Sequence, residues 1–399
     1  MSSGTLPPEP LDYPFDRGTS LHPHPLYSLL RRHRPVAAVT LPNGVPAYLV
    51  TRYADVRAVL EDSRFSRAAL SKTDPTRLVA YLPPERAENT GSADHSMPYE
   101  LLNRWFTPRA VERFRERAGQ VAAALVDAIR AQRPPVDAVA ALTTALPMTV
   151  MGELAGIPVD DRSWIAERAP LVVVESEDER SDRASKELFE YFRAQVDKRY
   201  AEPADDLLGH LVTAYQTSAP AMAADRLPQL AMRTCLPGFH SVSVTLSRGL
   251  PILCRQREIL ELIREQEDSI PAVVEELLRL TTPAATSLPR LTLEEVELAG
   301  RGIPAGSVVV AGLESANHDE ARYPNPGLID PGRGAPDHTT FGRGTNYCFG
   351  AALARMELQV ALTEIARGLP GIELAVPEST LEFRRGVIAP DVLRLPIRW

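Results

Sequence analysis

The sequence predicts a mainly helical protein with a minor β part, and three observations support this fold class. Residues 53–216 show mostly helical spacing of apolar side chains and contain good helix formers. A long, largely apolar stretch covers residues 225–265 and is expected to form a buried central helix. Strand-like runs are short and are limited to residues 36–51, 296–310 and 372–399.

The first elements are expected to be one helix and a small sheet. Residues 1–24 are rich in proline and are predicted to form a loosely ordered leader. Helical spacing begins at residues 26–34, and two apolar runs follow at 36–40 and 47–51. An Asn-Gly pair between these runs is typical of a two-residue hairpin turn, because both residue types tolerate positive φ. The two runs are therefore expected to pair as strands.

Helices are expected to dominate the middle of the chain. The best helix formers lie in residues 110–130 and 180–199, and prolines interrupt the pattern between them and after them. A further helix is expected over residues 270–280, with Pro271 in its first turn. Since there is no internal repeat and no long linker, residues 1–399 are predicted to form a single domain.

Composition argues against several classes of partner. Of the 399 residues, 44 are Lys or Arg and 52 are Asp or Glu, which gives a formal charge of −8. A nucleic-acid-binding protein needs clustered basic residues for its phosphate contacts, so this class is disfavoured. The polar N-terminus has no signal-peptide pattern, and no stretch approaches about 18 consecutive apolar residues. We therefore expect a cytoplasmic protein that binds neither nucleic acid nor membrane.

The most informative residue is Cys348, one of three cysteines with Cys235 and Cys254. A sparse, odd set of cysteines indicates reduced thiols or a ligand rather than a disulfide framework. Gly342 and Gly344 let the segment before Cys348 turn sharply. The helical residues that follow place the thiol at a helix N-terminus, which favours the thiolate form that binds metals.

The ordinary alternative for Cys348 is a buried structural cysteine beside a glycine-rich turn. The surrounding pattern, Phe-x-x-Gly-x-x-x-Cys-x-Gly over residues 341–350, is expected by chance in roughly two of ten thousand chains of this composition. Gly350 in this pattern leaves room for a large, flat partner. The segment therefore predicts a sulfur ligand presented to a cofactor.

The segment resembles the heme-ligand loop of the cytochrome P-450 family, with Cys348 at the position of the axial thiolate. The family's Glu-x-x-Arg pair is matched by Glu276-Leu-Leu-Arg279, for which the resemblance implies a salt bridge to Arg333. Alone the pair is weak evidence, since Glu112 and Arg115 have the same spacing and such pairs are normally helix-surface ion pairs. Other motifs in the family's order are Thr51-Arg-Tyr-Ala-Asp-Val, Arg64-Phe-Ser-Arg67, Phe106-Thr-Pro-Arg109, Pro289-Arg290, Ala316-Asn-His-Asp319, Tyr323-Pro-Asn-Pro326 and His338. The resemblance covers nearly the whole chain and implies the P-450 fold of the soluble bacterial type, with a long central helix over the heme and small sheets.

The resemblance implies heme b (iron protoporphyrin IX) as the cofactor, used with O2 and an external electron donor or with peroxide. A cysteinate behind the iron donates electron density that favours O–O cleavage. The donor expected for such a protein is of the ferredoxin type. Residues 95–104 have lost most of the basic side chains with which relatives dock this donor, and Glu100 reverses the charge. Electrostatic steering is therefore expected to be weaker, although Arg104 and Arg109 remain.

By position, the resemblance also implies the contacts of the heme. His95 and Arg290 fall at propionate-binding positions. Tyr99 and Asn346 stand where the family usually has cations, and both can hydrogen-bond without the charge. The remaining expected contacts are Phe341, Gly342, Gly344, Gly350 and Cys348 itself.

The family's Ala-Gly-x-acid-Thr motif of the central helix falls on residues 237–241, Pro-Gly-Phe-His-Ser. Gly238 is expected to leave a groove for oxygen, and Pro237 to strengthen a break in the helix by removing a backbone donor. Ser241 keeps the alcohol, while His240 replaces the acid and can relay protons near neutral pH. Two alternatives stay open. Either His240 points away and water alone carries protons, or a substrate carboxylate takes this place, held by His240 or by Arg233.

These features predict a bacterial heme-thiolate monooxygenase or oxidase that tailors a natural-product intermediate. The leading hypothesis is oxidation, including oxidative decarboxylation, of a carboxylate-bearing, peptide-like substrate. Conventional hydroxylation or epoxidation is the alternative, and a heme-containing binding protein without turnover is the alternative of another class. By position, the expected substrate contacts are Arg233, Pro237, Ser287, Leu288, Val387 and Ile388.

Overall fold

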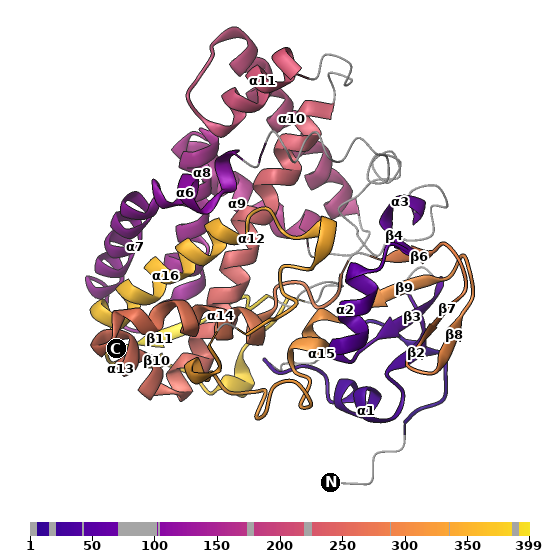
Figure 1. Cartoon of the computed structure of the whole chain (residues 1–399). Coiled ribbons are helices and arrows are strands. Elements are labelled where there is room, and N and C mark those ends of the chain that lie inside the picture. Colours follow the sequence, from indigo (N-terminus) through magenta and orange to yellow (C-terminus); the bar gives the residue numbers. More distant parts are fainter. Residues whose placement is uncertain are drawn as a thin grey trace. The chain divides into compact units, whose positions relative to one another are not determined.

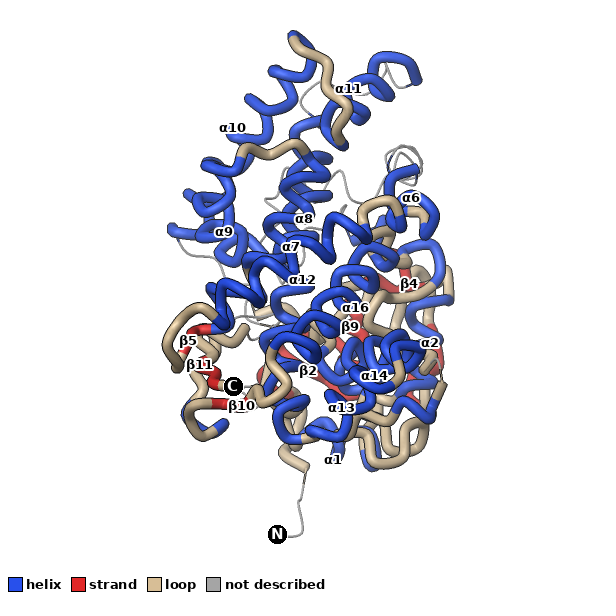
Figure 2. The backbone as a smooth tube through the Cα atoms, turned by 90° about the vertical axis from the view of Figure 1, so that its left-hand side faces the viewer, coloured by secondary structure: helices blue, strands red, loops and turns tan. Residues whose placement is uncertain are grey.

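The computed structural model describes residues 6–15, 21–41, 44–70, 102, 104–173, 179–218, 226–287, 289–334, 336–384 and 391–399. Within these residues, helices predominate and the strands form three small sheets (Figure 2). The predicted fold class, mainly helical with a minor β part, is therefore confirmed.

By their contacts, the residues divide into two compact units. Unit 1 comprises residues 1–93, 275–348 and 386–389, and unit 2 comprises residues 94–274, 349–385 and 390–399. The chain passes from one unit to the other within helix α14 (Ile270–Thr281) and again directly after Cys348. That the whole chain is one domain stays a prediction.

Unit 1 is built on a six-stranded sheet with the strand order β1-β2-β3-β9-β6-β4. The two predicted strands pair antiparallel as β2 and β3, with Val36 opposite Val50 and Thr40 opposite Pro46. This register leaves five residues between the strands, so the predicted two-residue turn is wrong. A parallel pairing of β3 with β9 brings a distant part of the chain into the same sheet. The six strands are β1 (Leu11–Asp12), β2 (Val36–Thr40), β3 (Pro46–Val50), β4 (Phe65–Ser66), β6 (Arg290–Thr292) and β9 (Val308–Ala311).

The burial of strand β9 shows that apolar residues cover both faces of this sheet. Successive side chains of a strand point to opposite faces, and all four residues of β9 are buried. Val309 belongs to one apolar cluster with Val56 of helix α2 (Tyr53–Glu61), whereas Val310 belongs to another with Leu30 of helix α1 (Leu26–His33). The run of β-branched residues thus forms the centre of unit 1 (Figure 1).

Shorter elements complete unit 1. Strands β7 (Val296–Leu298) and β8 (Arg301–Ile303) form a hairpin whose turn residues, Ala299 and Gly300, both have positive φ. The predicted turn before β9 is also present, with Gly306 at φ +76°. The remaining helical elements are α3 (Arg67–Leu70), α15 (Leu313–Asn317) and the 3₁₀ turns Pro331–Arg333 and Gly344–Asn346.

Unit 2 is largely a helical assembly around helix α12 (Arg226–Arg255), which contacts α8, α9, α10 and α16. Its small sheet has the order β10-β11-β5. The described helices of the unit are α6 (Pro108–Glu112), α7 (Arg115–Arg130), a π-helical turn (Val139–Thr143), α8 (Ala145–Ala155), α9 (Val159–Val173), α10 (Glu179–Ala201), α11 (Leu207–Ser218), α12, α13 (Arg257–Glu265) and α16 (Ala351–Gly368), with strands β5 (Val136–Asp137), β10 (Glu373–Leu374) and β11 (Pro396–Arg398).

Helix α12 is the expected buried central helix, but the predicted break in it is wrong. The sequence predicts a break at Pro237, whereas the helix continues through Pro237 and Pro251. Proline in a helix interior costs about 3 kcal/mol or more. Most residues of α12 are buried against neighbouring helices, so we attribute its continuity to this packing, which offsets the local cost. No described helix, α12 included, is both long enough and apolar enough to cross a membrane.

Helix α16 contains an ionisable group whose environment gives a testable pH dependence. Glu357 is 1% exposed, and neither carboxylate oxygen has a hydrogen-bond partner among the described residues. Burial raises the pKa of Glu357 well above its ordinary value. Above that ordinary value, the unfolded chain releases the proton while the folded chain keeps it. The free energy of unfolding therefore falls as the pH rises towards the folded-state pKa.

Replacing Glu357 by glutamine is expected to remove this loss of stability. The gain in the free energy of unfolding should grow by up to about 1.4 kcal/mol per pH unit above the ordinary glutamate pKa. Urea unfolding at a series of pH values measures it. Glu364→Gln on the same helix, where the side chain is partly exposed, is the control and should show no such growth. An equal effect of Glu357→Gln at every pH would contradict the assignment.

Candidate active site

Residues 341–348 of unit 1, which we call the cysteine segment, are held by a hydrogen bond of their own backbone. The amide of Cys348 donates to the carbonyl of Phe341 at 2.9 Å, which closes the loop. Gly342 and Gly344 have φ of +70° and +65°, a conformation that other residues rarely adopt, so both glycines are required for this path. Cys348 is exposed. After Gly350, helix α16 begins at Ala351, so Cys348 lies three positions before the first helical residue.

The Glu276–Arg279 pair lies at the centre of a buried ionic cluster in unit 1. Both side chains are 0% exposed, and the two carboxylate oxygens of Glu276 each accept from Arg279 at 2.8 Å. Arg333 Nε lies 3.2 Å from Glu276 Oε2. Arg279 also donates to the carbonyls of Asn317, Pro326 and Leu328 at 2.7–3.0 Å. The cluster therefore fixes the irregular chain that leads towards the cysteine segment.

A cationic cluster lies beside the cysteine segment in the same unit. Arg67 Nη1 donates to Asn346 Oδ1 at 2.9 Å. Arg290 is 5% exposed, donates to the carbonyl of Phe65 at 3.2 Å, and its Nε has no partner among the described residues. Burial and the nearby positive charge of Arg67 lower the pKa of Arg290 to about 10. The sequence predicts no role for Arg67, although Arg67 lies in the family motif of residues 64–67.

This cationic cluster fits the cofactor that the sequence implies. A buried guanidinium with an unpartnered nitrogen, next to a second guanidinium, is costly unless an anion lies against it. Arg290 makes no ion pair with any carboxylate of the described residues. A carboxylate of a bound cofactor would supply the missing negative charge, and heme carries two such propionate groups.

Part of α12 is open rather than buried. Arg233, Pro237 and Ser241 are partly or fully exposed, while most of the helix is buried. Their spacing of four residues places them on one face, together with the partly exposed Gly238. We call these four residues the open stripe. Arg233 forms no ion pair or hydrogen bond with the described residues.

Gly238 also lies at a close helix crossing. A Cβ atom added at this position would lie 3.1 Å from Met151 Sδ of helix α8. The small residue therefore lets α8 and α12 approach within unit 2. Its predicted role in leaving a groove for oxygen stays a prediction.

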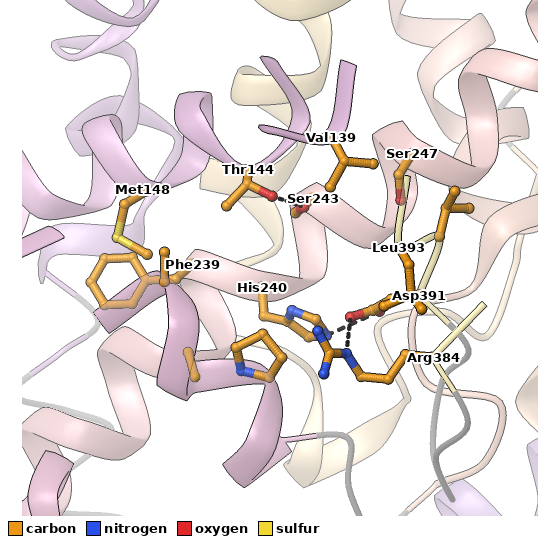
Figure 3. A pocket seen from close by; sticks show the side chains of 14 residues that line it. Val139, Thr144, Met148, Phe239, His240, Ser243, Ser247, Arg384, Asp391 and Leu393 are labelled. Atoms are coloured by element: carbon orange, nitrogen blue, oxygen red, sulfur yellow. Dashed lines mark hydrogen bonds and ion pairs between the residues drawn. The ribbon is translucent and has the colours of Figure 1, made fainter. Parts of the chain in front are cut away.

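His240 points into a cavity of about 120 Å³ within unit 2. The cavity has polar and apolar walls (Figure 3). Its lining includes Thr144 and Ser243, whose hydroxyls are 3.1 Å apart, and it does not include Arg233, Pro237 or Ser241. The other lining residues are Val139, Met148, Ala166, Ala169, Pro170, Phe239, Ser247, Arg384, Asp391, Val392 and Leu393.

Inside this cavity, His240 faces a carboxylate. His240 Nε2 lies 3.2 Å from Asp391 Oδ1, and both side chains are about nine-tenths buried, but neither atom has a hydrogen-bond partner among the described residues. Arg384 Nε lies 3.7 Å from Asp391 Oδ2 (Figure 3). A hairpin-like pairing places these residues, because Phe383 bridges Val392 and the amide of Arg384 donates to the carbonyl of Asp391 at 2.7 Å. The sequence pattern predicts neither Asp391 nor Arg384 as a site residue.

One further predicted contact, Ser287, lies among the described residues. The amide of Ser287 donates to the carbonyl of Ala311 at 2.8 Å, so Ser287 is tied to the end of β9 in unit 1. The predicted contacts that lie outside the described residues are His95, Tyr99, Leu288, Val387 and Ile388.

The chain is similar to proteins of known activity over nearly its full length. The cytochrome P450 family model matches residues 168–368. Nocardicin C N-oxygenase of Nocardia uniformis subsp. tsuyamanensis is 34% identical over 395 residues, which cover 97% of this chain and 98% of the relative. Mycinamicin IV hydroxylase/epoxidase of Micromonospora griseorubida is 35% identical over 98% of this chain and 99% of the relative. Among solved structures, HinD with NMFT and NO has a TM-score of 0.90 at 34% identity, over 98% of this chain and 100% of that chain.

Proposed function

Because the chain belongs to the cytochrome P450 family, we propose that Cys348 is the thiolate ligand of its heme and that His240 and Asp391 serve oxygen insertion into a polar natural-product intermediate. The protein is a P450 monooxygenase, with heme as cofactor and with O2 and an external electron donor as co-reactants. Its relatives tailor natural products. When bound, the heme supplies the oxidising chemistry, to which a cysteinate contributes electron density. The overall reaction consumes O2, two electrons and two protons, and gives one oxygen atom to the substrate and one molecule of water.

The proposed role of His240 and Asp391 in proton delivery rests on their contact inside the cavity. In the family motif, the acid comes from the central helix, and here that position holds His240. Asp391 brings a carboxylate to within 3.2 Å of His240 Nε2, but neither atom has a hydrogen-bond partner among the described residues, so the two groups are near each other and not aligned for a hydrogen bond. A proton can pass between them once a side chain turns to align the pair, and Ser241 follows on the open stripe of α12. We infer that this pair holds the proton that the family's acid would otherwise hold.

The polar lining of the cavity supports a substrate with hydrogen-bonding groups. Ser243, Thr144, His240, Asp391 and Arg384 supply donors and acceptors beside an apolar wall. Sites of this composition orient a ligand through a few polar contacts while apolar walls bury the rest. Relatives named as an N-oxygenase and as a hydroxylase/epoxidase act on natural products, so we propose a polar intermediate of the same broad class.

Oxidative decarboxylation is the second candidate, and Arg233 favours it. Because His240 already faces Asp391, Arg233 is the better remaining partner for a substrate carboxylate. It lies on the open stripe and makes no ion pair with the described residues. For a substrate R-CH2-CH2-COOH, the reaction with O2, two electrons and two protons gives R-CH=CH2, CO2 and two molecules of water. The carboxylate carbon leaves as CO2.

One experimental series distinguishes the two candidates. Heme absorption is recorded while matched pairs, each a carboxylic acid and its amide or methyl ester, are titrated into wild type, Arg233→Gln and His240→Ala. Decarboxylation predicts that acids bind at least about tenfold more tightly than their neutral partners and that Arg233→Gln removes this preference. Equal binding of acids and neutral compounds would exclude it and leave oxygen insertion.

The second arm of the series tests the His240–Asp391 pair. With any compound that wild type oxidises, Asp391→Asn is expected to lower the yield of product per electron pair by about 10-fold or more and to raise peroxide release. Glu382→Gln, which changes a nearby residue outside the cavity, is the matched control. If Asp391→Asn gave the same yield of product per electron pair as wild type, the proposed role of the pair would be refuted.

The electron donor is proposed to be an acidic iron–sulfur protein of the ferredoxin type. Arg104 and Arg109 are exposed on unit 2 and offer positive charge to such a partner. Most of the preceding segment that relatives use for docking lies outside the described residues.

A further inference from the structure

The sheet of unit 1 brings a second arginine to the predicted propionate-binding residue. Strand β4 pairs antiparallel with β6, so that Phe65 lies opposite Thr292 and Ser66 opposite Leu291. Continuing this register by one position places Arg67, at the start of α3, across from Arg290. Figure 1 shows α3 beside β4 and β6. The two guanidinium groups are close enough for the charge of Arg67 to lower the pKa of Arg290.

Arg67 also reaches the cysteine segment. Its Nη1 donates to Asn346 Oδ1 at 2.9 Å, two residues before Cys348. An asparagine can accept this bond but carries no charge of its own. Arg67 therefore brings a positive charge to the cysteine segment.

We propose that Arg67 binds a heme propionate together with Arg290, with Asn346 holding the guanidinium of Arg67 in place. The inference rests on the proposed function, because it requires the heme bound at Cys348. Two adjacent guanidinium groups repel each other, and one of them, Arg290, is almost fully buried. A propionate against both would neutralise this repulsion and would bond to the Arg290 nitrogen that has no partner among the described residues.

The experiment measures heme retention in the purified holoenzyme rather than turnover. Heme is transferred to an excess of apomyoglobin, and the rate is followed by absorption. Arg67→Gln is expected to lose heme about 10- to 100-fold faster than wild type, since a charge-assisted contact is removed. Arg64→Gln is the matched control, because Arg64 lies in the same segment, is exposed and is paired with Asp62. It should keep the wild-type rate.

A rescue variant distinguishes a propionate contact from a merely structural role. Adding Asn346→Arg to Arg67→Gln returns a cation to the cysteine segment, so heme loss should slow towards the wild-type rate. Arg67→Lys, which keeps the charge, should also retain heme better than Arg67→Gln. Fast heme loss that Asn346→Arg does not slow would mean that Arg67 acts on the fold, and it would overturn the inference.

Two further outcomes separate this inference from the proposed function. A wild-type protein that binds no heme with a thiolate-type spectrum would refute the proposed function itself. Wild-type protein that holds heme, together with Arg67→Gln that holds it equally well, would refute only the role of Arg67. The midpoint potential gives a second readout, since removing a cation near the propionates is expected to shift it in Arg67→Gln and not in Arg64→Gln.

Discussion

Replacing Cys348 by serine is expected to remove the thiolate-type spectrum of the reduced carbon monoxide complex and to lower product formation by at least about 100-fold. The hydroxyl of serine is not ionised at neutral pH and is a much weaker electron donor to iron than a thiolate. The fold should tolerate the change, because Cys348 is exposed and its backbone amide makes the bond to Phe341 that closes the loop.

The control for this variant is the same chemical change at another cysteine. Cys254, at the end of α12, is less exposed than Cys348, and burial raises the pKa of its thiol to about 11. Cys254→Ser should therefore keep the wild-type spectrum and activity. A Cys348→Ser protein with an unchanged carbon monoxide spectrum would show that another residue binds the iron.

Replacing Glu276 by glutamine is expected to lower the free energy of unfolding by about 3–5 kcal/mol, which is a large part of the stability of a typical protein. The substitution leaves Arg279, which is 0% exposed, without its ionised partner. Three backbone carbonyls still accept from Arg279, but none carries a full negative charge. Urea unfolding followed by circular dichroism measures the change.

The chain offers a control with identical spacing. Glu112 and Arg115 are also three residues apart and in contact at 2.6 Å, but both are exposed. Glu112→Gln should therefore change the stability by less than about 1 kcal/mol. Arg333→Gln, which removes one partner of Glu276, should have an intermediate effect that remains measurable if Glu276→Gln does not fold. Equal small effects at positions 112 and 276 would contradict the buried cluster.

The sequence predicts the parts of the fold that depend on local pattern. Helix α14 follows from helical spacing with Pro271 in its first turn, and the antiparallel pairing of β2 with β3 follows from two neighbouring apolar runs, although the predicted two-residue turn does not fit their register. Family order also places Arg333 near Glu276, where the structure has a 3.2 Å contact. These features need only a few neighbouring residues or a recognised order of motifs.

The residues that sequence analysis missed depend on contacts between distant segments. Asp391 follows His240 by about 150 positions, and no spacing rule connects them. The bridge between Phe383 and Val392 pairs the segments that carry Arg384 and Asp391, and both residues line one cavity with His240 of α12. Arg67 needed the register of β4 against β6 before its neighbours could be identified. The predicted break at Pro237 failed for the opposite reason, because burial of α12 outweighed a local rule.

The continuity of α12 through Pro237 also has a consequence for backbone solvation. Proline has no backbone N–H, so it cannot bond to the carbonyl oxygen of Arg233 four positions earlier. The ring of Pro237 takes the place of the missing N–H, so the carbonyl of Arg233 is expected to tilt outwards from the helix axis. Because both residues lie on the open stripe, solvent rather than the helix itself can satisfy this carbonyl. A residue with an N–H at position 237 would return the carbonyl to the helical hydrogen-bond pattern.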